Sequence, residues 1–169
     1  ARLPILTKPE IRANHAAFLR PGARRLAKYS TGGSTGEPLQ FFVGPGRVSA
    51  DIASRRRAMR WWDIDVGDPE IVLWGSPIEI TRQDRIRAMR DGLFRSTLLS
   101  AAGMTGPRMD QYLDAVERVR PAHIFSHASV LCELAAHAER TGRPLTGLGT
   151  RVVFVTSEEL YDYQRVQLE

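Results

Sequence analysis

Glycines and hydroxyl side chains are concentrated in one short stretch, hereafter the glycine-rich segment, Ser30-Thr31-Gly32-Gly33-Ser34-Thr35-Gly36-Glu37-Pro38. Glycine has no side chain to bury in a packed element, and Ser and Thr compete for backbone hydrogen bonds there. The composition suits a loop that brings backbone N–H groups and hydroxyls close to phosphate oxygens. A flexible linker is the alternative. We favour the phosphate-binding loop, because the segment is short, is closed by Pro38 and leads directly into residues 39–43, which predict a strand.

Two common phosphate-binding loops do not fit this segment. The Walker pattern GxxxxGK[ST] requires a Lys after its last glycine, where this chain has Glu37. The dinucleotide fingerprint GxGxxG fails in its glycine spacing and in the helix that should follow it. The segment resembles instead the phosphate-binding signature of the acyl-adenylate-forming enzymes, roughly [YS]TSGSTGxPK, which here is STGGSTGEPL. Two positions depart from that signature, with Gly32 in place of a Ser and Leu39 in place of a Lys that adds a phosphate-facing charge.

Within that superfamily, the chain is similar to the phenylacetate–CoA ligase branch, in which the Lys is commonly absent. Stretches like LPILTKPEIRAN, residues 3–14, also precede the glycine-rich segment in this branch. The branch includes homologues linked to polysaccharide and capsule biosynthesis. The resemblance covers nearly the whole chain as an N-terminal part of an AMP-binding domain. It implies that the nucleotide phosphates are bound by Thr31, Gly32, Gly33, Ser34, Thr35 and Gly36.

The resemblance also implies a reaction. A carboxylate attacks the α-phosphate of ATP, with Mg²⁺ helping, to give acyl-AMP and pyrophosphate, and a thiol such as coenzyme A then takes the acyl group and releases AMP. The family's later motifs and its lid domain would lie beyond Glu169, so no catalytic residue is assigned and the fragment alone is expected to be inactive. The alternative is a nucleotide-binding or scaffolding homologue that has lost catalysis, because Leu39 and Gly32 depart from the signature.

Apolar runs typical of strands alternate with helical patterns along the rest of the chain. The predicted strands are 39–43, 71–74, 94–99, 122–125 and 151–155. The predicted helices are 7–19, 47–62, 82–90, 107–119, 129–140 and one that begins at 158. This alternation predicts an α/β fold, in which an open parallel sheet has helices on both faces and a short hairpin carries the glycine-rich segment. We expect residues 1–169 to form a single domain that is part of a larger AMP-binding domain.

Ligands of open parallel sheets bind beyond the carboxyl ends of the strands, which here are followed by residues 75–77, 126–127 and 156–158. Thr156 or Ser157 could simply cap a helix that begins at Glu158. In the adenylate-forming enzymes, however, a small-residue loop at this place, often with a Glu, leads toward the adenine and acyl pockets. On that resemblance we predict that Ser157 and Glu158 bind the cofactor.

Strand alternation places His123, Phe125 and His127 on one face, and His127 stands where a strand ends. We predict that His127 lines the acyl-substrate pocket, against the alternative of a hydrogen-bonded structural histidine. No Cys or His at a useful spacing completes a metal site with these histidines, so no metal centre is predicted. Cys132 is expected to be a buried thiol.

Charge is distributed unevenly along the chain. Residues 1–62 contain twelve Lys or Arg and three acidic residues, a net charge of +9, whereas residues 63–169 have a net charge of −4. A basic region around the glycine-rich segment favours an anionic ligand such as a nucleotide polyphosphate. Nucleic acid is not an expected partner, since no binding module or interleaved aromatics accompany the arginines. No apolar run is as long as a membrane span, and the single cysteine fits a reducing cytoplasm, where we place the protein.

Overall fold

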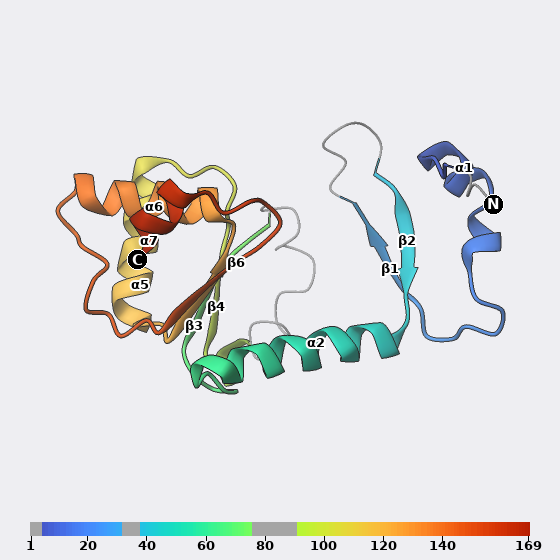
Figure 1. Cartoon of the computed structure of the whole chain (residues 1–169), viewed down its shortest axis with the longest axis horizontal. Helices are drawn as coiled ribbons and strands as arrows, with labels where there is room; N and C mark the ends of the chain where they lie inside the picture. Colours follow the sequence, from blue (N-terminus) through green and yellow to red (C-terminus); the bar gives the residue numbers. More distant parts are fainter. Residues whose placement is uncertain (1–4, 32–37, 76–90) are drawn as a thin grey trace. The chain divides into compact units, whose positions relative to one another are not determined.

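The computed structural model describes residues 5–31, 38–75 and 91–169 (Figure 1). The chain divides into two compact units, unit 1 from Ala1 to Ala58 and unit 2 from Met59 to Glu169, and each is described by itself. That both belong to one domain stays a prediction. Most of the glycine-rich segment, residues 32–37, and all of the helix predicted at 82–90 lie outside the described residues.

Unit 1 is built around a two-stranded antiparallel hairpin. Strands β1 (Ala27–Ser30) and β2 (Gln40–Val43) pair from Ala27 opposite Val43 to Ser30 opposite Gln40. The hairpin follows the short helices α1 (Lys8–Ala13) and η1 (His15–Phe18), and α2 (Pro45–Met59) follows the hairpin. The prediction of a hairpin that carries the glycine-rich segment is confirmed, because the segment connects these two strands (Figure 1).

The observed start of α1 agrees with the helix predicted at 7–19, and its observed end does not. The Glu10 carboxylate accepts hydrogen bonds from the Thr7 backbone N–H, at 2.8 Å, and from the Thr7 hydroxyl, at 2.7 Å. These bonds are typical of a capping box, and they hold the pKa of Glu10 below its ordinary value. The helix predicted to reach residue 19 ends instead at Ala13, because the Asn14 side chain donates to the Glu10 carbonyl oxygen at 3.0 Å.

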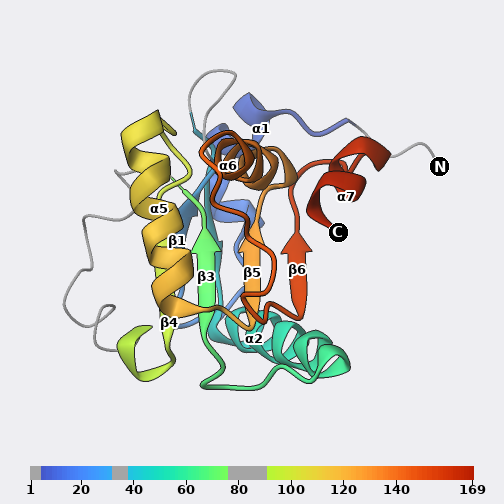
Figure 2. The same ribbon diagram turned by 90° about the vertical axis from the view of Figure 1, so that its left-hand side faces the viewer.

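Unit 2 contains the parallel sheet. Its strands are β3 (Glu70–Leu73), β4 (Ser96–Leu99), β5 (His123–Ser126) and β6 (Val152–Val155), in the spatial order β4-β3-β5-β6. Its helices are η2 (Arg60–Trp62), α5 (Gly106–Val119), α6 (Ala128–Arg140) and α7 (Asp162–Leu168). All neighbouring strands pair in parallel, and Figure 2 shows β3, β5 and β6 side by side and pointing the same way. The predicted open parallel sheet flanked by helices is therefore confirmed.

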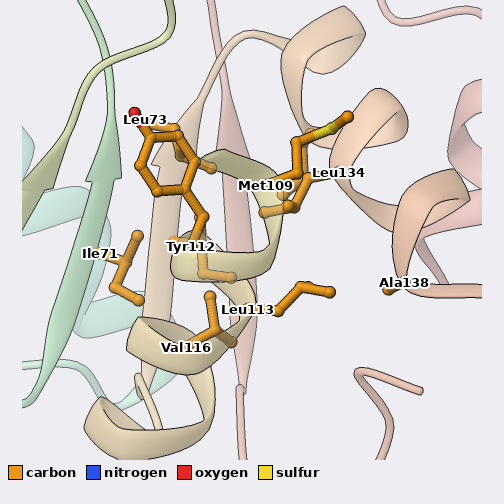
Figure 3. Packing of buried hydrophobic residues seen from close by; sticks show 10 residues of the cluster. Ile71, Leu73, Met109, Tyr112, Leu113, Val116, Leu134 and Ala138 are labelled. Atoms are coloured by element: carbon orange, nitrogen blue, oxygen red, sulfur yellow. The ribbon is translucent and has the colours of Figure 1, made fainter. Parts of the chain in front are cut away.

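The main core lies between this sheet and the helices α5 and α6. Strand residues Ile71, Leu73 and Ile124 pack against helix residues that include Leu113 and Leu134 (Figure 3). Leu73, Leu113 and Leu134 are fully buried. Burial of a large apolar side chain stabilises a fold by about 1.5–3 kcal/mol, so this layer anchors the strands whose ends form the candidate site.

Helices were expected on both faces of the sheet, and the described α-helices of unit 2 lie together on one side of it (Figure 1). The opposite face is covered in part by Met59 and Ile64, which pack with Ala122 and with the partly buried Val152 and Phe154. The helix predicted at 82–90 is outside the described residues.

The helix predicted at 47–62 is observed as α2 followed by the single turn η2. Helical spacing predicts that Val48, Ile52, Met59 and Trp62 share one face of this helix. Met59 is buried at 2% exposure, whereas Ile52 and Trp62 are 57% and 52% exposed. Of these four residues, Met59 alone belongs to a buried cluster, so the shared face is not packed along its length.

Candidate functional site

The carboxyl ends of the parallel strands meet at one edge of unit 2. Trp74, His127 and Thr156 directly follow β3, β5 and β6. The backbone pairing continues to this edge, since the Trp74 N–H donates to the Leu99 carbonyl at 3.0 Å and the Thr156 N–H donates to the Ser126 carbonyl at 3.2 Å. These side chains are therefore held by the sheet at the place where such folds bind ligands.

Aromatic rings form a layered surface at this edge. The indole of Trp74 stacks on the imidazole of His127, with ring centroids 4.2 Å apart and planes 13° from parallel. The Phe125 ring lies 5.6 Å from the same indole at a tilt of 42°. These contacts agree with the prediction that Phe125 and His127 share a face, and they orient the predicted pocket residue His127.

Trp74 is a site residue that the sequence reasoning missed, because the residue was included in a buried apolar strand. A signal was present in the pairing of the strands. Val72 lies opposite Phe125, and two residues further along each parallel strand the facing positions are Trp74 and His127. Which strands are neighbours could not be deduced from the local pattern, so this pairing was not predictable.

The side chain of Glu158 forms hydrogen bonds within the protein. Its carboxylate accepts a hydrogen bond from the Ser129 backbone N–H and another, at 3.0 Å, from the Ser129 hydroxyl. Ser129 is in the first turn of α6, where backbone N–H groups have no partner inside the helix. The Ser129 backbone N–H chiefly, with the Ser129 hydroxyl and the nearby His127 adding to it, holds the pKa of Glu158 below its ordinary value. Glu158 thus stays ionised and fixes the N-terminus of α6.

The helix predicted to begin at 158 begins instead at Asp162, so the interpretation of Thr156 or Ser157 as its cap is wrong. Ser157 has a left-handed backbone with φ of 69°, which turns the chain after β6 and directs Glu158 to α6. The helix is preceded by Tyr161, whose N–H donates to the Gln164 side chain at 3.0 Å. Glu158 therefore lies before the helix and contacts α6, a pairing between residues that are distant in the sequence.

Of the residues predicted to bind phosphate, the structure describes Thr31; Gly32, Gly33, Ser34, Thr35 and Gly36 lie outside the described residues. The Thr31 N–H donates to the Leu39 carbonyl, and the Leu39 N–H donates to the Thr31 hydroxyl oxygen, both at 3.0 Å. Thr31 and Leu39 therefore add one more pair to the hairpin and close the connection between its strands. The hydroxyl proton of Thr31 is still available to a ligand, since this contact uses only an oxygen lone pair.

A buried polar chain lies at the opposite end of the sheet, on the first residues of three strands. His123 Nε2 lies 3.0 Å from Glu70 Oε1, and the Ser96 hydroxyl donates to Glu70 Oε2 at 2.9 Å. Because the strands are parallel, these residues are separated from the site by the length of the sheet. These hydrogen bonds join β4, β3 and β5, so His123 has a structural role.

Cys132 does not contribute a reactive group. It is buried in α6, as predicted, and burial together with the charge of Glu158 raises the pKa of its thiol. In the described ranges, no three His, Cys, Asp or Glu residues stand close enough to hold a metal ion. No helix of the described residues is long and apolar enough to cross a membrane.

The hairpin followed by a parallel sheet with a strand-end site is the fold of part of the N-terminal domain of acyl-adenylate-forming ligases. This conclusion rests on solved structures of 2-hydroxyisobutyryl-CoA ligase, to which the chain is similar. An open conformation in complex with 2-HIB-AMP and CoA matches with a TM-score of 0.62 and 18% identity, over 94% of this chain and 37% of that one. The postadenylation state in complex with 2-HIB-AMP matches with a TM-score of 0.59 and 21% identity, over 94% of this chain and 34% of that one.

In sequence, the chain is similar to protein CapK of Staphylococcus aureus, with 22% identity over 169 residues, which are 99% of this chain and 37% of CapK. No protein-family model matches the chain. The resemblance to adenylate-forming enzymes that the glycine-rich segment indicated is therefore confirmed, and at these identities it is a similarity of fold. The chain spans little more than a third of the length of these relatives.

Proposed function

We propose that the protein to which this chain belongs uses ATP to activate a carboxylic acid as an acyl-adenylate and passes the acyl group to a thiol such as coenzyme A. The observation that carries this proposal is the similarity of the fold to a CoA ligase over 94% of the chain. The glycine-rich segment supports it independently, since its signature is that of a phosphate-binding loop and the hairpin closed by Thr31 and Leu39 presents it.

In this proposal the glycine-rich segment and the strand-end site have different tasks. Backbone N–H groups and hydroxyls of residues 31–36 bind the phosphates of ATP, and such donors stabilise charge that develops on phosphate during transfer. The stack of Trp74 on His127 provides a flat wall at the carboxyl ends of the strands for the acyl group. Ser157 turns the chain and Glu158 holds α6, so these residues shape the cofactor-binding edge from the protein side.

Coenzyme A and Mg²⁺ enter the proposal as a co-substrate and as the ion that accompanies ATP. We place the reaction in the cytoplasm, and the resemblance to the phenylacetate–CoA ligase branch supports a role in polysaccharide biosynthesis. The chain alone is expected to bind nucleotide at most, because it spans about a third of the ligases that it resembles.

The experiment is ATP–pyrophosphate exchange by the full-length protein with a panel of aliphatic, hydroxylated and aromatic carboxylic acids. We expect exchange that depends on one class of acid. Absence of exchange with every acid, in a protein shown to be folded, would contradict the ligase.

A nucleotide-binding homologue without catalysis is the second candidate. It is supported by Leu39, which stands where the signature has a Lys and contributes only backbone atoms to the contact with Thr31. Calorimetry that shows ATP binding without acid-dependent exchange would favour this candidate. Turnover of any acid would exclude it.

A further inference from the structure

An open cavity of about 640 Å³ lies at the base of the hairpin in unit 1. One side is the segment 18–26, which contains the connection from η1 to β1, and the other is the junction of β2 and α2 at residues 42–47. A cavity of this volume is large enough for a small molecule. It contains none of the residues assigned to nucleotide or acyl binding, so it is separate from the site described above.

Four large apolar side chains belong to the lining of this cavity. Phe18, Leu19, Leu26 and Phe42 all line it. Phe18 is 52% exposed although it is a large aromatic side chain, so much of its apolar surface is in contact with water. A ligand with an apolar body would remove this surface from water, which is the main favourable contribution to binding by such side chains.

The lining also contains positively charged side chains. Arg20 and Arg24 line the cavity, and within the described residues their guanidinium groups make no ion pair or hydrogen bond. Arg47, which also lines the cavity, is paired with Asp51. Among the described residues, no acidic side chain lines the cavity, and the first turn of α2, which starts here, has none either. Two unpaired guanidiniums beside an apolar wall select a ligand that is anionic at one end.

We propose that this cavity binds an amphipathic anion, in which a carboxylate or phosphate monoester is attached to an apolar chain or ring. Arg20 and Arg24 hold the anionic group through charge-assisted hydrogen bonds, and Phe18 and Phe42 cover the apolar body. The site goes beyond the proposed adenylation and does not depend on it, because every residue given for its lining belongs to unit 1 and none is assigned to nucleotide or acyl binding.

Two fluorescent probes with nearly the same aromatic body test the proposal on the 169-residue chain. Anilinonaphthalene sulfonate has an anionic group, and phenylnaphthylamine lacks it. We expect the sulfonate to bind at least about tenfold more tightly, the effect of one hydrogen bond to a charged group. The double variant Arg20→Ala/Arg24→Ala should lose this preference and still bind the neutral probe, whereas Phe18→Ser should weaken both probes.

The matched control is Lys8→Ala/Lys28→Ala, which removes the same charge from exposed positions of unit 1 that do not line the cavity. It should bind both probes as the unmodified chain does, with circular dichroism confirming that every variant is folded. Equal losses in the control and the arginine variant would mean general charge attraction and would overturn the proposal. Displacement of the sulfonate by decanoate assigns a carboxylate ligand, displacement by decyl phosphate assigns a phosphate monoester, and displacement by neither contradicts the site.

Discussion

At the scale of single residues, the contacts of Glu158 change how its role is understood. The resemblance predicted a cofactor-binding residue, and the structure shows a carboxylate whose two oxygens are both bound to Ser129. A carboxylate in this position offsets the unpaired N–H groups of a helix terminus. We therefore expect Glu158 to act on the site by holding α6 and its preceding residue His127 in place.

Substitution of Glu158 should change the pH dependence of stability. Because its folded pKa lies below the unfolded value of 4.5, the carboxylate stabilises the fold above about pH 4.5, and this contribution disappears as the pH falls through the folded value. Urea denaturation of Glu158→Gln should show a smaller loss of unfolding free energy between pH 7 and pH 3.5 than the unmodified chain. The neighbouring Glu159→Gln is the control and should keep the original difference. Equal pH dependence in all three proteins would contradict the role of Glu158.

The glycine-rich segment gives a second prediction at this scale, for the full-length protein. Thr35→Val keeps the shape of the side chain and removes its hydrogen-bond donor. Loss of a hydrogen bond to a charged group costs about 1.5–3 kcal/mol, so ATP affinity measured by calorimetry should fall on the order of 10- to 100-fold. Ser49→Ala, in α2 outside the segment, is the control. If Thr35→Val binds ATP as tightly as the unmodified protein, the segment is a linker and the phosphate-binding assignment fails.

At the scale of elements, α5 contributes buried residues to the core between the sheet and its helices. Substitutions of these residues should therefore lower the stability of the fold. Leu113 is fully buried in this core, and Leu→Ala in such a site typically costs 2–5 kcal/mol because a cavity remains. We expect Leu113→Ala to lower the unfolding free energy by about this amount, with an unchanged denaturant slope. Leu93→Ala is the matched control, since Leu93 is 77% exposed and should change stability by less than about 0.5 kcal/mol. A similar effect in both variants would contradict the assignment of the core.

The strands and the helices α5 and α6 were predictable because each has a complete local signal. Residues such as Ile71 and Leu73 form a short apolar run, and α5 repeats apolar residues at helical spacing. The start of α7 was not predictable, since it depends on the contact of Glu158 with α6, which is distant in sequence. Trp74 was missed for the same reason, because its partner His127 follows a different strand, β5, and is distant in the sequence.

At the scale of the whole molecule, the buried residues among those that the structure describes all belong to unit 2. The two clusters of buried hydrophobic residues are formed entirely by residues of unit 2. Arg151 adds a polar connection within this unit, donating to the Asp63 carbonyl at 2.5 Å and to Asp68 Oδ2 at 2.9 Å. Among the described residues of unit 1, by contrast, none is buried.

Residues 59–169 should therefore fold without unit 1. Expressed alone, they are expected to show a cooperative urea transition, because the sheet, α5, α6 and α7 keep all of the buried contacts seen in the intact chain. Leu113→Ala should lower the unfolding free energy of this fragment as much as it does in the intact chain, since distant and independent parts contribute additively. Residues 1–58 alone should show no cooperative transition, because a hairpin and helices without a buried core do not offset the entropy of ordering the chain. A fragment 59–169 without a transition, or a smaller effect of Leu113→Ala in it, would show that unit 1 completes the core.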